Sequence, residues 1–373
     1  MNQHPSWLDS LETPCIVIDV DKARRNLIRM QQEADRCSCA LRPHVKTHKM
    51  PLFARMQVEL GAKGITCAKV SEAEVMADGG LQDIFIAYPM VGEHRIRRAI
   101  ALSRRIPRLI LAVDSMDSAR QLSEAAQREQ ATLEVRLELD TGAGRTGIDR
   151  QGVVALAQAV DKLPGLHLTG IYTFKGLTLQ GQPCTDAKQA AIEEAEWLAD
   201  AARRIRASGI ELKEVSGGST PTGVEVARTG LVNEIRPGTY IFNDRLLCAE
   251  GWCTEEDIAA RYCVTVVSVS PRGYAVIDGG TKTFSCDIPV GVAPYHFPGY
   301  AMPVGRPDLR LARMNEEHGI LVADGGDTGL KVGQKLLLWP LHVCTAINLQ
   351  NQVYLLENET LRPIPVSARG MLV

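Results

Sequence analysis

Residues 41–49 read Leu41-Arg42-Pro43-His44-Val45-Lys46-Thr47-His48-Lys49, a short apolar stretch that leads into a lysine flanked by two histidines. A segment of helical character, residues 50–61, follows at once. A lysine at the mouth of a strand can have its amine pKa lowered by burial and by nearby cations, and it can then attack a carbonyl to form a Schiff base. The motif alone is weak evidence, because most clusters of lysine and histidine are solvated loop residues.

Outward from this motif, short β-branched or apolar runs alternate with longer segments of helical period from residue 40 to about residue 245. The runs predict eight strands, at residues 41–46, 64–70, 83–88, 108–114, 133–140, 168–174, 212–216 and 233–241. The intervening helices include residues 116–130, 152–162 and 187–207, and Ser71-Glu72-Ala73-Glu74 is typical of a capping box at a helix start. Alternating strands and helices imply a parallel sheet, and a count of eight favours a closed (β/α)8 TIM barrel. The rival, a doubly wound sheet, is disfavoured because no GxGxxG turn follows the first strand.

The pattern changes near residue 250. Predicted strands at residues 264–269, 274–277, 335–339 and 353–356 are joined by turns rich in glycine and proline, which indicates a separate all-β domain. The opening strand, residues 15–20, precedes a helix over residues 21–34 and could belong to either domain. We therefore expect an α/β chain with a (β/α)8 barrel at residues 22–245. Residues 1–21 and 246–373 would form the β-strand domain.

Composition narrows the possible partners and the compartment. The 373 residues include 42 basic and 44 acidic side chains, a net charge of −2, which argues against nucleic acid or an anionic membrane as partner. Residues 1–12 carry no apolar signal-peptide core, and no run approaches the roughly 20 apolar residues that span a bilayer. The ten cysteines include no CxxC pair, so we expect reduced thiols and a cytoplasmic protein.

Polar residues gather where the predicted barrel strands end, which is where such barrels carry their active sites. The seventh strand runs into Gly217-Gly218-Ser219-Thr220 and the eighth into Arg236-Pro237-Gly238-Thr239-Tyr240. Glycine N–H groups and hydroxyls suit a phosphate. A helix cap is the simpler interpretation of the first segment alone, but its position on strands seven and eight favours phosphate binding. Arg145 lies among glycines after the fifth strand, either as a surface arginine or as a donor to the phenolic oxygen of a bound ring.

The β domain carries Pro340-Leu341-His342-Val343-Cys344. On a strand, residues two apart face the same side, so imidazole and thiol would converge. These groups suit Zn²⁺, and two protein ligands would leave positions for water and substrate. Without other context, a buried cysteine beside a satisfied core histidine is the more frequent interpretation.

Taken in order, residues 42–49, 217–222 and 236–240, Glu317-His318-Gly319 and the His342-x-Cys344 pair resemble the D-serine dehydratase/D-threonine aldolase family. Its members are metal-assisted enzymes of the alanine racemase barrel type (fold type III) that use pyridoxal 5'-phosphate (PLP). The resemblance covers nearly the whole chain, and residues 140–147 also resemble a loop of alanine racemases. Two segments depart from the family pattern, Thr173-Phe174-Lys175 and residues 278–282.

The resemblance implies the site. Lys46 would hold PLP as a Schiff base, and the metal, Zn²⁺ with Mn²⁺ or Mg²⁺ as alternatives, would bind His342 and Cys344. Arg145 would lie near the ring hydroxyl, while Tyr172 and Arg236 compete for the pyridine nitrogen. The full set of expected cofactor-binding residues is Lys46, His44, Arg145, Tyr172, Gly218, Ser219, Thr220, Arg236, Gly238, Thr239 and Tyr240. The resemblance also implies a homodimer with its active site at the subunit interface.

We predict a lyase that acts on a D-configured 3-hydroxy amino acid such as D-serine or D-threonine. In dehydration Lys46 removes the α proton, the metal assists departure of the β-hydroxyl, and the products are a 2-oxo acid and ammonia. An aldolase would instead release glycine and an aldehyde; cysteine at position 344, where the family's aldolases tend to have aspartate, favours dehydration. An amino-acid racemase and a non-catalytic PLP carrier are further alternatives. A racemase has no use for a metal, and a carrier lacks a second domain.

Overall fold

The computed structural model describes residues 5–373, so the first four residues of the expected β-strand domain lie outside the described part. The chain divides into two compact units, which we describe separately. The barrel unit comprises residues 28–46, 50–238 and 371–373. The strand unit comprises the described residues up to Leu27, residues 47–49 and residues 239–370.

The barrel unit contains an eight-stranded parallel sheet in the order β2-β11-β10-β7-β6-β5-β4-β3. Its two end strands are joined through the segment after β2, because Thr66 N–H donates to Pro43 O and His44 forms an isolated parallel bridge with Thr66. The expected barrel is therefore confirmed. In chain order its strands are β2 (Ala40–Leu41), β3 (Ile65–Cys67), β4 (Asp83–Pro89), β5 (Arg108–Val113), β6 (Leu133–Leu139), β7 (Leu166–Thr173), β10 (Glu214–Gly217) and β11 (Glu234–Ile235).

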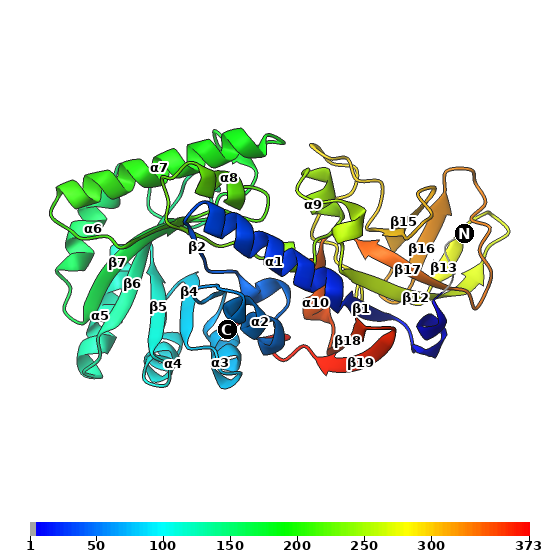
Figure 1. Cartoon of the computed structure of the whole chain (residues 1–373), viewed down its shortest axis with the longest axis horizontal. Helices are drawn as coiled ribbons and strands as arrows, with labels where there is room; N and C mark the ends of the chain where they lie inside the picture. The colour runs from blue at the N-terminus through cyan, green and yellow to red at the C-terminus, as the bar shows by residue number, and fades with distance from the viewer. Residues whose placement is uncertain (1–4) are drawn as a thin grey trace. The chain divides into compact units, whose positions relative to one another are not determined.

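Helices follow the strands, and Figure 1 shows α3 to α7 on the outer side of this sheet. Small polar residues start two of them: Ser115 accepts from Ser118 N–H ahead of α5, and Asp186 accepts from Gln189 N–H ahead of α7. A small hairpin, β8 (Thr178–Leu179) and β9 (Gln182–Pro183), precedes α7. The helices of this unit are α2 (Pro51–Glu59), α3 (Val70–Asp78), α4 (Glu93–Ser103), α5 (Met116–Arg128), α6 (Val153–Asp161), α7 (Ala187–Ala207) and α8 (Gly223–Arg228).

The predicted capping box at residues 71–74 is wrong. Helix α3 begins one residue earlier, at Val70, and its N-cap Lys69 makes no side-chain cap hydrogen bond. Ser71 instead donates its hydroxyl to the backbone oxygen of Val373 at 2.7 Å, and the Glu72 carboxylate accepts from Ala68 N–H at 2.7 Å. The tertiary partner of Ser71 is 302 residues away, so the local pattern could not reveal it.

Charged side chains lie inside the barrel. Arg42 and Arg136 are fully buried, and both donate to the buried carboxylate of Glu234, at 2.8 and 2.5 Å. Ser216 donates to the same carboxylate at 2.7 Å. The guanidinium groups hold the pKa of Glu234 well below its ordinary value, although burial acts in the opposite direction as the largest single effect. This network links strands β6, β10 and β11 with the segment after β2.

The strand unit is built on a nine-stranded sheet of mixed direction. The opening strand β1 (Cys15–Asp19), which the sequence left open between the two domains, lies here, antiparallel to β12 and parallel to β18. The other strands are β12 (Ala260–Val269), β13 (Ala275–Ile277), β14 (Ala301–Pro303), β15 (Leu309–Met314), β16 (Gly319–Ala323), β17 (Lys335–Pro340), β18 (Gln352–Glu357) and β19 (Thr360–Pro365). Of these, β14, β15, β16 and β19 were not predicted.

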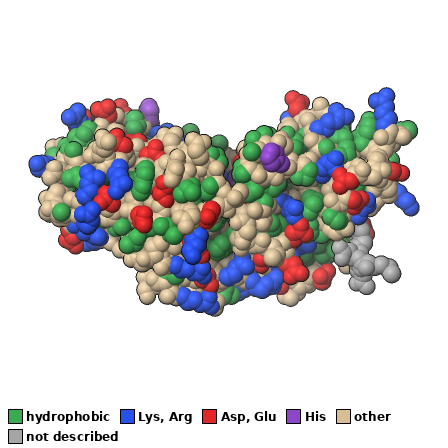
Figure 2. Space-filling view, turned by 90° about the horizontal axis from the view of Figure 1, so that it is seen from above, with side chains coloured by type: hydrophobic (Ala, Val, Ile, Leu, Met, Phe, Trp, Pro, Cys, Tyr) green, Lys and Arg blue, Asp and Glu red, His purple; other side chains and the backbone are tan. Residues whose placement is uncertain are grey.

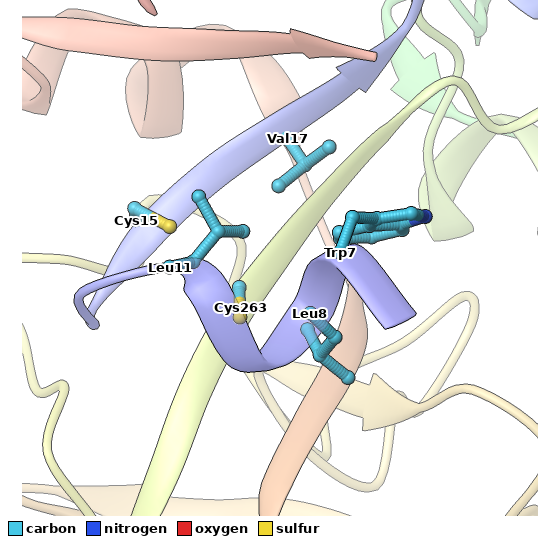
Figure 3. Close-up of a cluster of buried hydrophobic side chains, with 6 residues drawn as sticks. All are labelled: Trp7, Leu8, Leu11, Cys15, Val17 and Cys263. Atoms are coloured by element: carbon cyan, nitrogen blue, oxygen red, sulfur yellow. The ribbon is translucent and has the colours of Figure 1, made fainter. Parts of the chain in front are cut away.

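A hydrophobic cluster holds the start of the chain against this sheet (Figure 3). The short helix η1 (Ser6–Ser10) supplies Trp7 and Leu8, and Leu11 follows it. These side chains pack with Cys15 and Val17 of β1 and with Cys263 of β12. Burial of such apolar surface is what fixes β1 between its two partners.

Short helical segments complete the strand unit, together with the first part of α1 (Val20–Arg36), which then continues into the barrel unit. They are α9 (Arg245–Ala249), α10 (Val343–Leu349), η3 (Thr239–Ile241) and η4 (Glu255–Asp257), and η2 (Val45–Thr47) joins the two units along the chain. The expectation that His342 and Cys344 lie on a strand is wrong. His342 is the N-cap of α10 and Cys344 lies in its first turn, because β17 ends at Pro340.

The surface is polar and of mixed charge. On the face shown in Figure 2, basic and acidic side chains are interspersed over both units. Within residues 5–373, no helix combines the length and the apolar character needed to cross a membrane.

Candidate functional site

Lys46 lies on a turn rather than on a strand. Strand β2 ends at Leu41, and the chain then enters η2, where Lys46 is half-buried. Nδ1 of His44 accepts the backbone N–H of Lys46 at 3.2 Å, and His44 N–H donates to Pro237 O at 2.9 Å. His44 thus connects the lysine turn to the segment that follows β11, and these two hydrogen bonds fix the backbone from which the Lys46 side chain extends.

The side chains of Lys46 and Arg145 both lie near the ring of Phe174. Its centroid is 5.4 Å from Nζ of Lys46 and 4.8 Å from Cζ of Arg145, and the side chain is 37% exposed. Arg145 comes from the loop after β6, where Asp140 accepts the N–H groups of Gly142 and Gly144. The structure therefore brings Lys46 and Arg145 to one aromatic ring, which belongs to the segment that departs from the family pattern.

Tyr172 and Arg236, the two candidates for the pyridine nitrogen, are neighbours. The guanidinium carbon of Arg236 is 5.1 Å from the ring centroid of Tyr172. The Tyr172 hydroxyl donates to Glu138 at 2.9 Å, and burial raises the pKa of the phenol well above its ordinary value. Arg236 donates to the Ser216 hydroxyl and to the backbone oxygen of Thr173. Burial lowers the pKa of this guanidinium, and the Glu234 carboxylate opposes that effect.

The predicted phosphate loop is a tight turn after β10. Gly218 has φ +77°, and a Cβ there would lie 2.7 Å from Cα of Gly223, so the position requires glycine. Ser219 and Thr220 are buried, and Gly238 N–H donates to the Thr220 hydroxyl at 3.3 Å. The loops after β10 and β11 thus meet at small residues and hydroxyl groups. Backbone N–H groups and hydroxyls of this kind are the donors that bind a phosphate.

The remaining two phosphate candidates, Thr239 and Tyr240, belong to η3 of the strand unit. Tyr240 is buried. The hydroxyls of Thr239 and Thr47 lie 3.4 and 3.2 Å from Sγ of Cys344. In this unit the thiol of Cys344 is therefore surrounded by hydroxyl groups.

His342 has a carboxylate partner. Its Nδ1 lies 2.6 Å from Oδ2 of Asp287, whose Oδ1 accepts from the Thr345 hydroxyl at 2.8 Å. Burial lowers the pKa of His342, but the Cys344 thiol and the Asp287 carboxylate outweigh burial and raise it well above its ordinary value. With Nδ1 committed to Asp287, Nε2 is the nitrogen that remains for a ligand.

The donor set fits a metal ion. Metal-binding histidines commonly donate their other N–H to a carboxylate, and thiolate with imidazole is a Zn²⁺ donor set. Among the described residues, no group of three or more His, Cys, Asp and Glu side chains is arranged to hold a metal.

Sequence reasoning missed two residues at these sites. Asp287 lies 55 residues before His342 and has no local signal. Glu194 accepts from Gly218 N–H at 2.7 Å, behind the phosphate loop. It did carry a signal, because it occupies the buried face of α7 together with Ala190, Ala191 and Leu198. A carboxylate on the apolar face of a helix requires a partner.

Two family models match the chain in succession. The alanine racemase N-terminal domain matches residues 18–245, and the putative serine dehydratase domain matches residues 259–356.

Relatives match over almost the full length. D-threonine aldolase of Arthrobacter is 31% identical over 97% of this chain and 94% of its own. D-threo-3-hydroxyaspartate dehydratase of Delftia is 34% identical over 90% and 91%. The solved structure of the Delftia dehydratase superimposes with a TM-score of 0.87, covering 96% of this chain and 98% of that one at 32% identity. A D-threonine aldolase from Filomicrobium marinum gives 0.86 at 31% identity over 97% of each chain.

The predicted resemblance is thereby confirmed across both units. The chain belongs to the D-serine dehydratase/D-threonine aldolase family of PLP-dependent lyases, in which an alanine racemase-type barrel precedes a serine dehydratase domain.

Proposed function

We propose that the protein dehydrates a D-configured 3-hydroxy amino acid to a 2-oxo acid and ammonia, with PLP and a divalent metal. The observation that carries this proposal is the pair His342 and Cys344, with Nδ1 of His342 held by Asp287. Solved structures of D-threo-3-hydroxyaspartate dehydratase include variants with alanine in place of a histidine and of the cysteine two residues further on, the latter in a metal-free form. The same spacing separates His342 and Cys344.

The residues expected to bind the coenzyme are assigned as follows. Lys46 would bind its aldehyde carbon, and Arg145 would lie near the ring hydroxyl. Gly218, Ser219, Thr220, Gly238, Thr239 and Tyr240 would hold the phosphate. His44 would support the lysine turn, and either Tyr172 or Arg236 would serve the pyridine nitrogen. These assignments rest on the family pattern and on the contacts described above for each residue.

When bound, PLP supplies an electron sink for charge at the α-carbon of the substrate, and the metal supplies a Lewis acid for its β-hydroxyl. The chain supplies the proton transfer. Nζ of Lys46 takes the α proton, for which a half-buried amine on a fixed turn is suited. His342 and Cys344 hold the metal, and Asp287 orients the imidazole. The loop at residues 217–220 would hold the phosphate of the coenzyme.

The finer assignments are proposals as well. We propose a PLP-binding barrel at residues 22–245 and a metal-carrying domain at residues 1–21 and 246–373, supported by the two matched ranges, 18–245 and 259–356. We propose Zn²⁺ as the metal, from its thiolate and imidazole donors. A homodimer with the active site at the subunit interface follows the family pattern. A cytoplasmic location is supported by ten free thiols.

The alternative is a D-threonine-type aldolase, because the Arthrobacter relative carries that name. Purified enzyme loaded with PLP and Zn²⁺ should be incubated separately with D-serine, D-threonine and D-threo-3-hydroxyaspartate. We expect ammonia and a 2-oxo acid in equal amounts. Glycine with an aldehyde would replace the dehydratase proposal with the aldolase, and L-enantiomer formation would favour a racemase.

The role of Lys46 is tested with two variants. Lys46→Ala removes the amine, and Lys46→Arg keeps a cation that cannot form the imine linkage. Both should lose the visible absorption of bound PLP and at least about 10³-fold in kcat. Lys162→Ala, at an exposed lysine that ends α6, should change neither. Full activity in Lys46→Arg would rule out covalent catalysis by this residue.

A further inference from the structure

A second pair of reactive groups lies in the strand unit. Sγ of Cys248 and Sγ of Cys253 are 3.6 Å apart, and both side chains are partly exposed. Cys248 lies near the C-terminal end of α9 and Cys253 lies five residues further on. We propose that these two cysteines form a dithiol site that closes to an intrachain disulfide when a peroxide oxidises it. This proposal does not depend on the proposed activity.

The backbone already holds the two cysteines together. Gly251 N–H donates to Cys248 O at 3.1 Å, and Trp252 N–H donates to Leu247 O at 3.0 Å. Gly251 has φ +74°, the left-handed conformation that turns the chain back over the end of a helix. Helix α9 is fixed at its other end by Asp244, which accepts from Leu247 N–H at 3.0 Å. Side-chain rotation can therefore bring the sulfur atoms from 3.6 Å toward the ~2.0 Å of a disulfide.

The two sulfur atoms have different roles. The thiol of Cys253 lowers the pKa of Cys248 by hydrogen bonding, and the cation of Arg245 acts in the same direction. The same interaction raises the pKa of Cys253. Cys248 also lies three residues after Arg245 on α9, so both side chains share one face of the helix, and burial opposes but does not cancel the lowering of its pKa. We therefore assign Cys248 as the nucleophile and Cys253 as the resolving thiol.

The oxidation requires only the two thiols and hydrogen peroxide. The thiolate of Cys248 attacks one oxygen of hydrogen peroxide, the O–O bond breaks, and Cys248 sulfenic acid and hydroxide form. The sulfur of Cys253 then attacks the sulfenic sulfur, an S–S bond forms, and the sulfenic oxygen leaves as water with the proton of the Cys253 thiol. Peroxide is reduced by two electrons, and the two thiols are oxidised by two.

The chain contains its own controls. Cys15 and Cys263 are directly paired across β1 and β12, but both are buried in the cluster of Figure 3. This pair tests whether two neighbouring thiols form a disulfide when peroxide cannot reach them. Cys286 is exposed and belongs to neither of these two cysteine pairs. It therefore tests whether exposure to peroxide alone is enough for oxidation.

The test uses the full-length protein loaded with PLP and Zn²⁺, reduced and then freed of small thiols. After a hydrogen peroxide titration, free thiols are alkylated and the protein is digested with trypsin. Cleavage after Arg245 and Arg261 places Cys248 and Cys253 in one peptide, residues 246–261. We expect that peptide to lose two hydrogen atoms and to resist alkylation until a reductant is added. Cys15 and Cys263 should remain alkylated.

The Cys253→Ser variant provides the second measurement. Without the resolving thiol, the sulfenic acid of Cys248 should persist and be trapped by a 1,3-dicarbonyl reagent, at least about tenfold more than in the wild type. Cys286→Ser should leave the 246–261 peptide unchanged in behaviour. The proposal is overturned if wild-type residues 246–261 keep both thiols at a peroxide concentration that oxidises Cys286. Pairing of Cys248 with another cysteine would overturn it equally. Both readings come from the wild type, so they stand even if a variant fails to fold.

Discussion

Glu194 and Gly218 are joined by a hydrogen bond of 2.7 Å from the backbone N–H of the glycine to the carboxylate of the glutamate. Glu194 is fully buried on α7, and its other oxygen lies 3.5 Å from the Thr222 hydroxyl. The bond fixes the proposed phosphate loop to a helix that takes no other part in the site. Glu194 is therefore a positioning residue, and its removal should affect cofactor binding through the loop.

Glu194→Ala should lower the free energy of unfolding by about 1–3 kcal/mol, because the buried N–H of Gly218 loses its acceptor. PLP should bind more weakly, and the deficit should appear in the dissociation constant of PLP before it appears in kcat. Urea unfolding and PLP titration measure the two effects. Glu194→Gln keeps an acceptor oxygen and should restore PLP affinity. Glu196→Ala, an exposed glutamate on the same helix, should leave both quantities unchanged.

The stability difference between Glu194→Gln and wild type should depend on pH. Burial raises the pKa of Glu194 above its ordinary 4.5, although Gly218 N–H, Arg236 and Lys175 oppose the shift. A group with a raised folded pKa contributes most to stability below its unfolded pKa and loses that contribution as pH rises through the folded value. The free energy of unfolding of the glutamine variant should thus rise relative to that of the wild type as pH increases above the ordinary 4.5 of the carboxyl. A difference in the free energy of unfolding that does not change with pH would contradict a raised pKa for the buried carboxyl of Glu194.

Glu234→Gln should be among the most damaging substitutions in the barrel. It leaves the buried guanidiniums of Arg42 and Arg136 without their shared anion, which costs about 3–5 kcal/mol at neutral pH. The pKa of Glu234 is depressed, so the stability it supplies is present above its ordinary 4.5 and lost as pH falls through the folded value. The difference in free energy of unfolding between the variant and the wild type, measured by urea unfolding, should therefore become smaller at acidic pH. Glu211→Gln, at an exposed glutamate, serves as control.

Asp287→Asn should weaken metal binding without removing a metal ligand. Loss of the carboxylate that holds Nδ1 of His342 should reduce metal affinity about 10- to 100-fold. Equilibrium dialysis against Zn²⁺ gives the affinity, and the PLP absorption spectrum should be unchanged. His342→Ala should lose the metal altogether, whereas Asp324→Asn, at an exposed aspartate, should bind as the wild type does. If both Asp287→Asn and His342→Ala bound Zn²⁺ with wild-type affinity, the assignment of the metal site to the start of α10 would be wrong.

The barrel could be predicted because its signals are local. All eight predicted strands correspond to observed ones, and the predicted helix over residues 187–207 has the bounds of α7. Strands β2 and β11 are only two residues long, so Lys46 lies on a turn that hydrogen bonds from distant segments define. Strands β14, β15, β16 and β19 were missed. Strand β14 is only three residues long and pairs with the distant β17, whereas β15 with β16 and β18 with β19 form hairpins between neighbouring segments.

The site was less accessible to sequence than the fold. The spacing of His342 and Cys344 suggested a shared face, but a strand was the wrong reason, because the pair begins a helix. Neither Asp287 nor the proximity of Phe174 to Lys46 and Arg145 has a local signature. Such partners are set by tertiary packing, which joins residues far apart in the chain.

The pairing of β1 with β12 also affects how the chain is made. Cys15 of β1 pairs with Cys263 of β12, so the first strand leaves the ribosome roughly 250 residues before its partner strand. The whole barrel is synthesised in between. During that interval the nascent chain carries an apolar strand with both edges open, and a chaperone or the emerging barrel must keep it from pairing with a neighbouring polypeptide.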